Sequence, residues 1–355
     1  MNSPARTAAT RSARPVLRFG AGLSVRYSVR PVLACVLLLA AAAGCGIALI
    51  GAGEYPVAPQ DVARALFGDG SPADVYVVRE LRLPRALTGL LAGAALALAG
   101  AVFQSVARNP LGSPDVIGFG QGSAAGALCA IVLLHGSTAA VQAGSVIGGL
   151  LTGALIYLLA WRKGIHGYRL VLVGIGGAAV LTGVNQYLLT RAAIGDATRA
   201  VLWLTGSLNG RGWQHVWPLL AAFAVLAPLV IGHARHLGML EMGDDAASAL
   251  GVPVERVRLT VMGAATLLTA AATAAAGPLA FVALTGPQLA RRLTRSPGPN
   301  LFPAACMGGA LLLAADWLSQ HLFGSDQLPV GAVTGVLGGV YLLWLLASER
   351  RAGRI

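Results

Sequence analysis

The amino-acid sequence predicts an all-α protein that crosses a membrane about ten times. Of its 355 residues, 56% are hydrophobic and only 11% are charged, whereas an ordinary soluble domain carries about 25% charged residues. The apolar residues gather in ten runs, most of them near the roughly 20 residues that an α-helix needs to cross a bilayer. The basic residues fall between these runs instead of forming one patch, so the net charge of +12 does not indicate a nucleic-acid-binding surface.

The first 30 residues carry six arginines and no acidic residue, and an apolar run from Pro31 to Ile50 follows them. A signal peptide has a similar order, and Ala42-Ala43-Gly44-Cys45 resembles a lipoprotein cleavage site. The basic segment is long for a signal peptide, however, and further spans follow. We therefore interpret residues 1–30 as a basic cytoplasmic tail and residues 31–50 as the first transmembrane helix.

Nine further apolar runs alternate with polar segments between residues 51 and 347. Two of the polar segments, 57–67 and 200–208, are expected to form short helices along the membrane surface. The segment from Arg108 to Pro114 is unsuited to a regular helix, so its backbone must be buried against protein or water. The expected transmembrane domain covers residues 31–347, followed by a cytoplasmic tail at 348–355, with spans at 31–50, 86–107, 116–134, 139–161, 170–190, 213–233, 259–276, 278–293, 302–322 and 329–346.

The basic residues are distributed unevenly over the two sides that ten spans define. With the N-terminus in the cytoplasm, the inside segments hold 19 of the 26 Lys and Arg residues, and the outside loops hold seven. This asymmetry is the positive-inside pattern of membrane proteins. It predicts that both termini and the polar segment 234–258 face the cytoplasm.

The stretch from Met239 to Arg258 is the only sizeable polar segment in the second half of the chain. Asp244 is suited to be an N-cap and Gly251 begins a helix stop, so a helix of about six residues is expected from Asp245 to Leu250. An isolated helix shorter than roughly 12 residues is marginal in water. We therefore interpret it as an element that docks on another surface, with a capped turn in a cytoplasmic loop as the alternative.

Few ionisable or strongly polar side chains lie within the spans. Asp316 is the clearest of them, and Gln104, Asn185 and Gln186 are uncharged candidates. Polar residues inside a membrane are candidates for function by default, although hydrogen bonding between helices explains each of them equally well. The spans hold no acid–base pair of the kind that an ion-coupled pump needs at mid-membrane.

The sequence gives no sign of a metal site, a disulfide framework or a nucleotide site. The four cysteines lie in or beside apolar runs without a close pair. His233 and His236 share a helix face, but no carboxylate or cysteine close in sequence completes a metal-binding set. Lys163 is the only lysine, and no phosphate-binding glycine precedes it. We therefore expect no cofactor and no metal in this chain.

A set of segments spread over about residues 50 to 347 carries a more specific signal. They are Arg82 to Gly100, Gln104, Arg108 to Leu111, Gly118 to Gly126, Gly243 to Val252, Gly277 to Leu284, Ala315-Asp316 and Leu328 to Gly335. In these residues and in their order the chain resembles the FecCD family of permeases, which import iron-siderophore complexes and cobalamin. The resemblance implies that Gly243 to Val252 is the coupling motif of that family.

The resemblance implies a ten-helix permease that pairs with a second, identical or sister permease. Its other partners would be two cytoplasmic ATP-binding subunits and an extracytoplasmic substrate-binding lipoprotein. This chain would then not be an enzyme, because ATP would be hydrolysed on the partner subunit.

The resemblance also implies roles for individual residues. Arg82 and Arg85 would dock the binding protein, although interfacial snorkelling also explains two arginines at the start of a span. The residues that would couple to the ATPase are Gly243, Asp244, Asp245, Ala246, Ala247, Ser248, Leu250, Gly251 and Val252. The candidates for the translocation path are Gln104, Asn109, Gln121, Asn185 and Gln186.

The substrate expected from the resemblance is a ferric siderophore. Pro287-Gln288 stands where the family often has Pro-His, and Ser296 to Asn300 replaces an Asp-His-Arg. The Pro-Gln-x-Ala-Arg-Arg form is similar to the catecholate-siderophore branch, with cobalamin or haem as the alternatives. An outer arginine of some members corresponds to Gln320 here. The other classes are an ion-coupled secondary transporter, which needs no docking helix, and an intramembrane enzyme, for which no nucleophile and base are assignable.

Overall fold

The computed structural model describes residues 16–19, 23–26, 29–51, 53, 55–115, 118–161, 167–322 and 328–351, so Lys163 lies outside the described residues. The fold is helical, as predicted, apart from two short antiparallel strands, β1 (Val16–Phe19) and β2 (Leu23–Arg26). The helices are α1 (Val29–Gly51), α2 (Pro59–Phe67), α3 (Pro72–Tyr76), the π-helix η1 (Val77–Arg82), α4 (Leu83–Ala107), α5 (Phe119–Leu128), the π-helix η2 (Cys129–Leu133), α6 (Thr138–Ala160), α7 (Gly167–Arg191), α8 (Ile194–Leu204), α9 (Trp213–Gly232), α10 (Ala234–Leu240), α11 (Asp244–Ala249), α12 (Val254–Ala276), α13 (Val282–Thr294), α14 (Leu301–His321) and α15 (Val330–Arg351).

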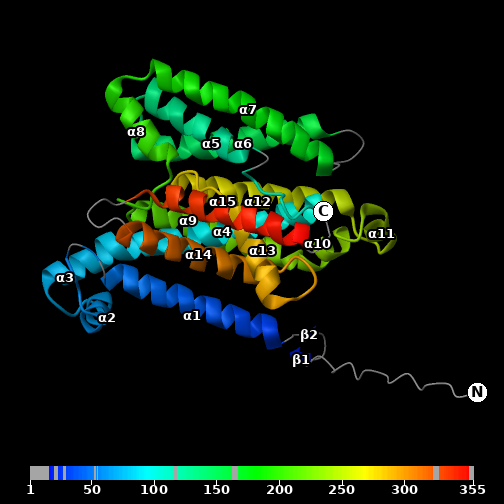
Figure 1. Ribbon diagram of the computed structural model, residues 1–355, viewed down its shortest axis with the longest axis horizontal. Helices are drawn as coiled ribbons and strands as arrows, with labels where there is room; N and C mark the ends of the chain where they lie inside the picture. Colours follow the sequence, from blue (N-terminus) through cyan, green and yellow to red (C-terminus); the bar gives the residue numbers. More distant parts are fainter. Residues whose placement is uncertain are drawn as a thin grey trace, which may run out of the picture.

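The helices form layers around α4 (Figure 1). α4 packs against α14, α12, α13 and α9, and α1 covers the far side of α14. α5, α6, α7 and α8 form a separate layer, drawn in green at the top of Figure 1. α11 lies at one end of the bundle, and α2, α3 and α8 lie at the opposite end. This arrangement separates the polar segment around α11 from the loops that the arginine pattern assigns to the outside.

Among the described residues, seven helices are long and apolar enough to cross a membrane. They are α1, α4 with its N-terminal extension, α6, α7, α9, α12 and α14, and shorter apolar helices lie at Phe119–Leu133 and Val330–Leu345. α13 has only 13 residues. Each range expected to be a span overlaps helical residues among those described. The third range falls on two successive helices, α5 and η2, and the eighth falls on the short α13.

Direct backbone contact explains the small residues of α4. The apolar window of this helix is 83% buried, more than that of any other candidate span. A Cβ atom at Gly93 would collide with the carbonyl oxygen of Gly308 in α14, and one at Gly100 would collide with that of Ala283 in α13. Glycine at these positions lets neighbouring helices approach within backbone distance, which is a common way to pack helices in membranes.

Two irregular segments interrupt the helices and pack against each other. Residues 108–115 follow α4, and residues 277–281 join α12 to α13. The Gln288 side chain donates a hydrogen bond to the Pro110 carbonyl oxygen at 2.6 Å, and a carboxylate oxygen of Asp115 accepts one from the Phe281 backbone. The backbone that cannot be helical is thus buried against protein, as its position in a membrane protein requires.

Several element boundaries differ from the sequence-based expectation. α12 begins at Val254 rather than at 259, because its first polar turn is still helical, and α13 begins at Val282 rather than at 278. The surface helix expected at 200–208 is α8, at Ile194–Leu204. The one expected at 57–67 is α2, at Pro59–Phe67, with proline at its first position.

Candidate coupling surface and translocation path

α11 is a six-residue helix, Asp244–Ala249, that lies one residue earlier than expected. The predicted N-cap role of Asp244 is wrong, because the N-cap is Gly243 and no side chain accepts a hydrogen bond there. Gly243 has a φ of +116°, a conformation that side chains disfavour. After the helix, Gly251 adopts the left-handed conformation that the sequence predicts, with a φ of +81°.

The Asp244 carboxylate binds arginine side chains instead of capping the helix. Both of its oxygens accept hydrogen bonds from Arg258 Nη2 at 2.9 Å. Arg258 lies on α12 with its side chain only 4% exposed, and it also donates to Glu255 at 3.1 Å. Arg108, at the end of α4, lies 3.7 Å from Asp244. These ion pairs fasten α11 to α12 and to α4.

α11 presents one face to the protein and the other to its surroundings. Ala247 and Val252 are buried against the bundle. The outward face carries Asp245, Ser248 and Ala249, and Leu250 follows them with 60% of its surface exposed. The exposed face therefore combines small residues, which permit close approach, with one large apolar side chain.

A second ion pair joins the same region to α13. Arg291 of α13 donates to Glu241 Oε1 at 2.8 Å, and Ser105 of α4 donates to the same oxygen at 2.7 Å. Glu241 lies between α10 and α11. The segment around α11 is thus bonded to three helices that run through the centre of the molecule.

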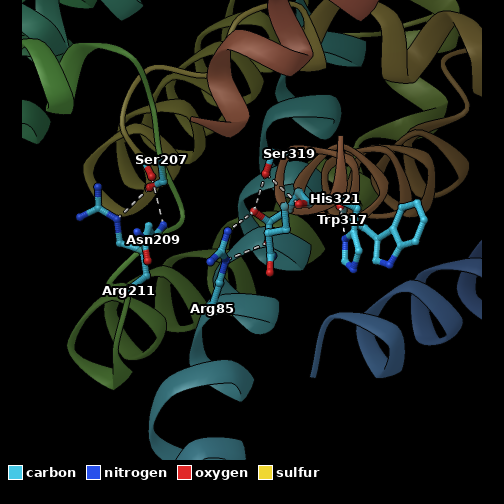
Figure 2. A network of polar contacts seen from close by, with 9 residues as sticks. Arg85, Ser207, Asn209, Arg211, Trp317, Ser319 and His321 are labelled. Atoms are coloured by element: carbon cyan, nitrogen blue, oxygen red, sulfur yellow. Dashed lines mark hydrogen bonds and ion pairs between the residues drawn. The ribbon is translucent and has the colours of Figure 1, made fainter. Parts of the chain in front are cut away.

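Arg82 and Arg85, the two arginines at the start of α4, both have partners inside the protein. Arg82 donates to the backbone oxygens of Ile50 and Tyr55, at 2.8 and 2.6 Å, and has no ion pair among the described residues. Arg85 makes a two-pronged ion pair with Asp316, at 3.0 and 2.8 Å, and Asp316 is fully buried. The Ser319 hydroxyl lies 3.5 Å from Oδ1 of the same carboxylate, and Arg85 and Ser319 are both labelled in Figure 2. The Arg85 charge is therefore balanced within the chain.

The structure divides the candidates for the translocation path into two groups. The Gln104 amide is buried and donates to the Leu284 carbonyl oxygen at 3.0 Å, which is a contact between helices. Asn109 accepts a bond from the Leu111 N–H at 2.9 Å and stabilises a turn. These two residues do not reach the cavity that the other candidates line.

A cavity of about 470 Å³ is lined by the other three candidates, Gln121, Asn185 and Gln186. The Asn185 amide donates to the side-chain oxygen of Gln121 at 3.1 Å. Asp115 also lines this cavity, and its Oδ2 atom has no partner among the described residues. Burial raises the pKa of Asp115 to about 7, although the hydrogen bond from the Phe281 backbone favours the charged form.

Comparison with known protein families identifies this arrangement. The model of the FecCD transport family matches residues 33–348. The chain belongs to this family. As a member it is a multi-pass membrane protein and the permease component of an ABC importer, a class that works with ATPase and substrate-binding partners.

The permease is similar to curated relatives over most of its length. It is 46% identical over 330 residues to the ferric enterobactin transport system permease protein FepG of Escherichia coli (strain K12), covering 92% of this chain and 99% of the relative. It is 32% identical over 285 residues to the cobalamin import system permease protein BtuC of Halobacterium salinarum, covering 80% of this chain and 76% of the relative.

A solved structure of a metal-chelate type ABC transporter in an inward-facing conformation has the same fold as the permease. The TM-score is 0.79 at 25% sequence identity, and the match covers 88% of this chain and 98% of that one.

Sequence reasoning missed four candidate functional residues of the permease, namely Asp115, Glu241, Arg258 and Arg291. Each of them interacts with a residue from another part of the chain, as Arg291 does with Glu241. Charge was the only signal in the sequence that could have pointed to them. Asp115, for example, is the only acidic residue in the irregular segment after α4.

Proposed function

We propose that this permease carries a ferric siderophore of the catecholate type across the cytoplasmic membrane by ATP-driven alternating access. The observation that carries the proposal is the 46% identity over 99% of a relative whose described cargo is ferric enterobactin. Pro287-Gln288, which is similar to the motif of the catecholate branch, supports the proposal further. The Gln288 side chain is hydrogen-bonded to Pro110, in the irregular segment that ends at the cavity.

The proposed assembly contains a second permease subunit, two ATP-binding subunits and an extracytoplasmic binding lipoprotein. Both termini of the permease face the cytoplasm, and the chain itself binds neither cofactor nor metal. The arginine asymmetry supports this orientation, as does the position of α11 at the end opposite α2, α3 and α8. The iron complex is cargo and not a resident group.

α11 is the proposed contact with the ATPase. Its exposed face and Leu250 would enter a cleft of that subunit, where a buried apolar side chain contributes most to binding. The ion pairs of Asp244 and Glu241 would pass the displacement to α12, α13 and α4. Gln121, Asn185 and Gln186 would face the cargo in the cavity.

At the outer end, Arg82 and Arg85 are the proposed docking residues for the binding protein. Arg82 is the stronger candidate, because no carboxylate among the described residues offsets its charge, whereas Asp316 offsets that of Arg85. Long-range attraction to an acidic rim would act mainly on the association rate.

Uptake by proteoliposomes that contain the whole transporter tests the function. We expect ATP-dependent uptake of an iron-labelled catecholate siderophore in the presence of the binding protein, and none of labelled cobalamin. Cobalamin uptake instead would favour the second candidate, which the 32% identity to a cobalamin permease supports. Uptake without ATP, driven by an ion gradient, would contradict both.

A further inference from the structure

An apolar groove of about 520 Å³ runs between α6, α9 and α12. Val146 and Ile147 of α6, Leu226 of α9 and Leu267 of α12 are among its lining residues. Its rim is open, since Ile147 is 56% exposed. The only polar residues in the lining are Gln142 and His215. Both polar residues lie near the starts of their helices, α6 and α9, so the groove is apolar with one polar end. This pattern suits an acyl chain with its headgroup at the polar end.

A partly buried cation lies at the polar end of this groove. Arg211, in the loop between α8 and α9, donates from Nε to the Ser207 carbonyl oxygen at 3.0 Å, as Figure 2 shows. It has no ion pair among the described residues, and burial lowers its pKa. A cation withdrawn from water without a counter-ion is costly, and the described residues supply no carboxylate here, so the position favours a bound anion.

The neighbour of Arg211 adds a second hydrogen-bond donor. Arg211 Nη1 lies 3.2 Å from Nε2 of His215, which is 2% exposed. Arginine has no acceptor atom, so Nε2 must accept this bond and the ring proton must lie on Nδ1. The Gly212 backbone interacts with this ring, but it makes no hydrogen bond of good geometry to Nδ1. The polar end of the groove therefore holds a poorly satisfied donor on His215 beside the Arg211 guanidinium.

A second cavity, of about 390 Å³, adjoins the groove and adds positive charge. The two share Gln142 and Ala274, and the second cavity is also lined by Arg85, Arg199 and Arg211. Only Arg85 is paired with a carboxylate among the described residues. Among the described residues, the junction of the polar cavity and the apolar groove therefore carries an excess of positive charge.

We propose that this groove binds an anionic phospholipid of the outer leaflet, with an acyl chain between α6, α9 and α12 and the phosphate beside Arg211. A free phosphate would use the same guanidinium, but it would leave the apolar groove unfilled. The lipid would hold the loop after α8 against α6 and α9. The assignment to the outer leaflet rests on the proposed orientation, but lipid binding itself does not depend on the cargo, so the two are tested separately.

The test uses the detergent-purified transporter with its ATPase and titrates it with phosphatidylglycerol or phosphatidylcholine. Native mass spectrometry measures the lipid adducts, and thermal melting measures the stabilisation. We expect phosphatidylglycerol to bind preferentially, and Arg211→Gln to weaken it about tenfold, the effect of one lost charge-assisted contact. Arg64→Gln is the matched control, because Arg64 is an exposed arginine on α2, far from the groove.

Two further variants separate binding from folding. Arg211→Lys loses the bond to Ser207 but keeps the charge, and we expect it to retain most of the preference for phosphatidylglycerol. Ala222→Phe fills the groove from α9 while keeping Arg211, and we expect it to reduce the adducts of both lipids. Ala222→Phe also keeps the test valid if Arg211→Gln does not fold.

Three results would overturn the proposal. One is equal binding of the two lipids by the parental protein, and another is an unchanged preference in Arg211→Gln. The third is displacement of the lipid by millimolar inorganic phosphate or by a ferric catecholate complex, which would assign the site to a free anion or to the cargo.

Discussion

Arg258 illustrates how one side chain holds the coupling region together. It is buried on α12, and its carboxylate partners lie on the same helix, at Glu255, and on α11, at Asp244. Its partner Asp244 remains about one-third exposed, so the pair is only partly desolvated. Such a pair contributes more than a surface salt bridge, yet part of its attraction is screened by water.

Replacing Arg258 with Gln should loosen α11 without unfolding the permease. We expect a loss of about 1–3 kcal/mol, because Asp244 loses a charge-assisted partner. Thermal melting measures this loss, and hydrolysis of ATP per cargo imported measures the coupling, which should worsen. Arg256→Gln, which removes an exposed arginine two residues earlier, is the control. A melting temperature and a coupling ratio equal to those of the control would contradict the assignment.

Charge reversal should affect the two outer arginines differently. Arg82→Glu should weaken docking of the binding protein, and the effect should shrink as salt is added. Arg85→Glu should instead destabilise the fold, by about 3–5 kcal/mol, because it places a carboxylate against the buried Asp316. Binding kinetics at two salt concentrations and thermal melting distinguish the outcomes. If the double variant Arg82→Glu with Arg85→Glu imports cargo at the parental rate when binding protein is scarce, neither residue docks it.

The raised pKa of Asp115 predicts a pH dependence of stability. Its folded pKa of about 7 exceeds its ordinary value of 3.8, so the folded state binds the proton more tightly than the unfolded state does. The native state should therefore lose stability as the pH rises from about 4 to 7. In this range the carboxyl group ionises freely in the unfolded state, whereas in the folded state burial keeps it protonated. Asp115→Asn should remove this slope in thermal melts. A slope that persists in the variant would show that other groups cause it.

At the scale of elements, short helices depend on their surroundings more than on their own sequence. The stop at Gly251 was predictable, because a left-handed residue followed by Pro253 ends a helix by local geometry alone. The start was not predictable. Asp244 could cap the helix or pair with Arg258, and the choice depends on where α12 places its first turn. Asp115 and Phe281 are likewise adjacent only through tertiary packing, so the composition of the cavity could not be derived from either segment.

A charge at the exposed end of α11 should abolish coupling without affecting insertion. Leu250→Asp replaces the one large apolar side chain of this surface, and we expect the ATPase to bind at least about tenfold more weakly. The variant should enter the membrane in parental amounts, fail to co-purify with the ATPase and give no uptake. Phe67→Asp, which alters an exposed apolar residue on α2, should behave like the parent. Normal ATPase retention by Leu250→Asp would contradict the proposal that α11 contacts the ATPase.

At the scale of the whole molecule, the helical architecture was largely predictable and its layers were not. The apolar runs gave each long helix within a few residues, because hydropathy reports directly on burial in lipid. Which helix occupies the centre depends on backbone contacts between helices, such as that of Gly100 with Ala283. A glycine pattern in one helix does not show which other helix packs against it.

The orientation of the molecule is testable with single cysteines. In a background without Cys35, Cys45, Cys129 and Cys306, Ser248→Cys and Asp69→Cys should be labelled from opposite sides by an impermeant reagent. The positive-inside pattern predicts that Ser248 faces the cytoplasm and that Asp69 faces the outside. Labelling of both from the same side of the membrane would overturn the topology.

The backbone contacts of α4 have a mechanical consequence. At Gly93 and Gly100 no side chain separates α4 from α14 and α13, so no rotamer change is available there to absorb a displacement. A force applied at the C-terminal end of α13, where Arg291 is bonded to Glu241, would be transmitted to α4 without being absorbed by side-chain movement. The three helices should therefore move as one stiff body, and the compliance of the permease should lie in the layer formed by α5 to α8.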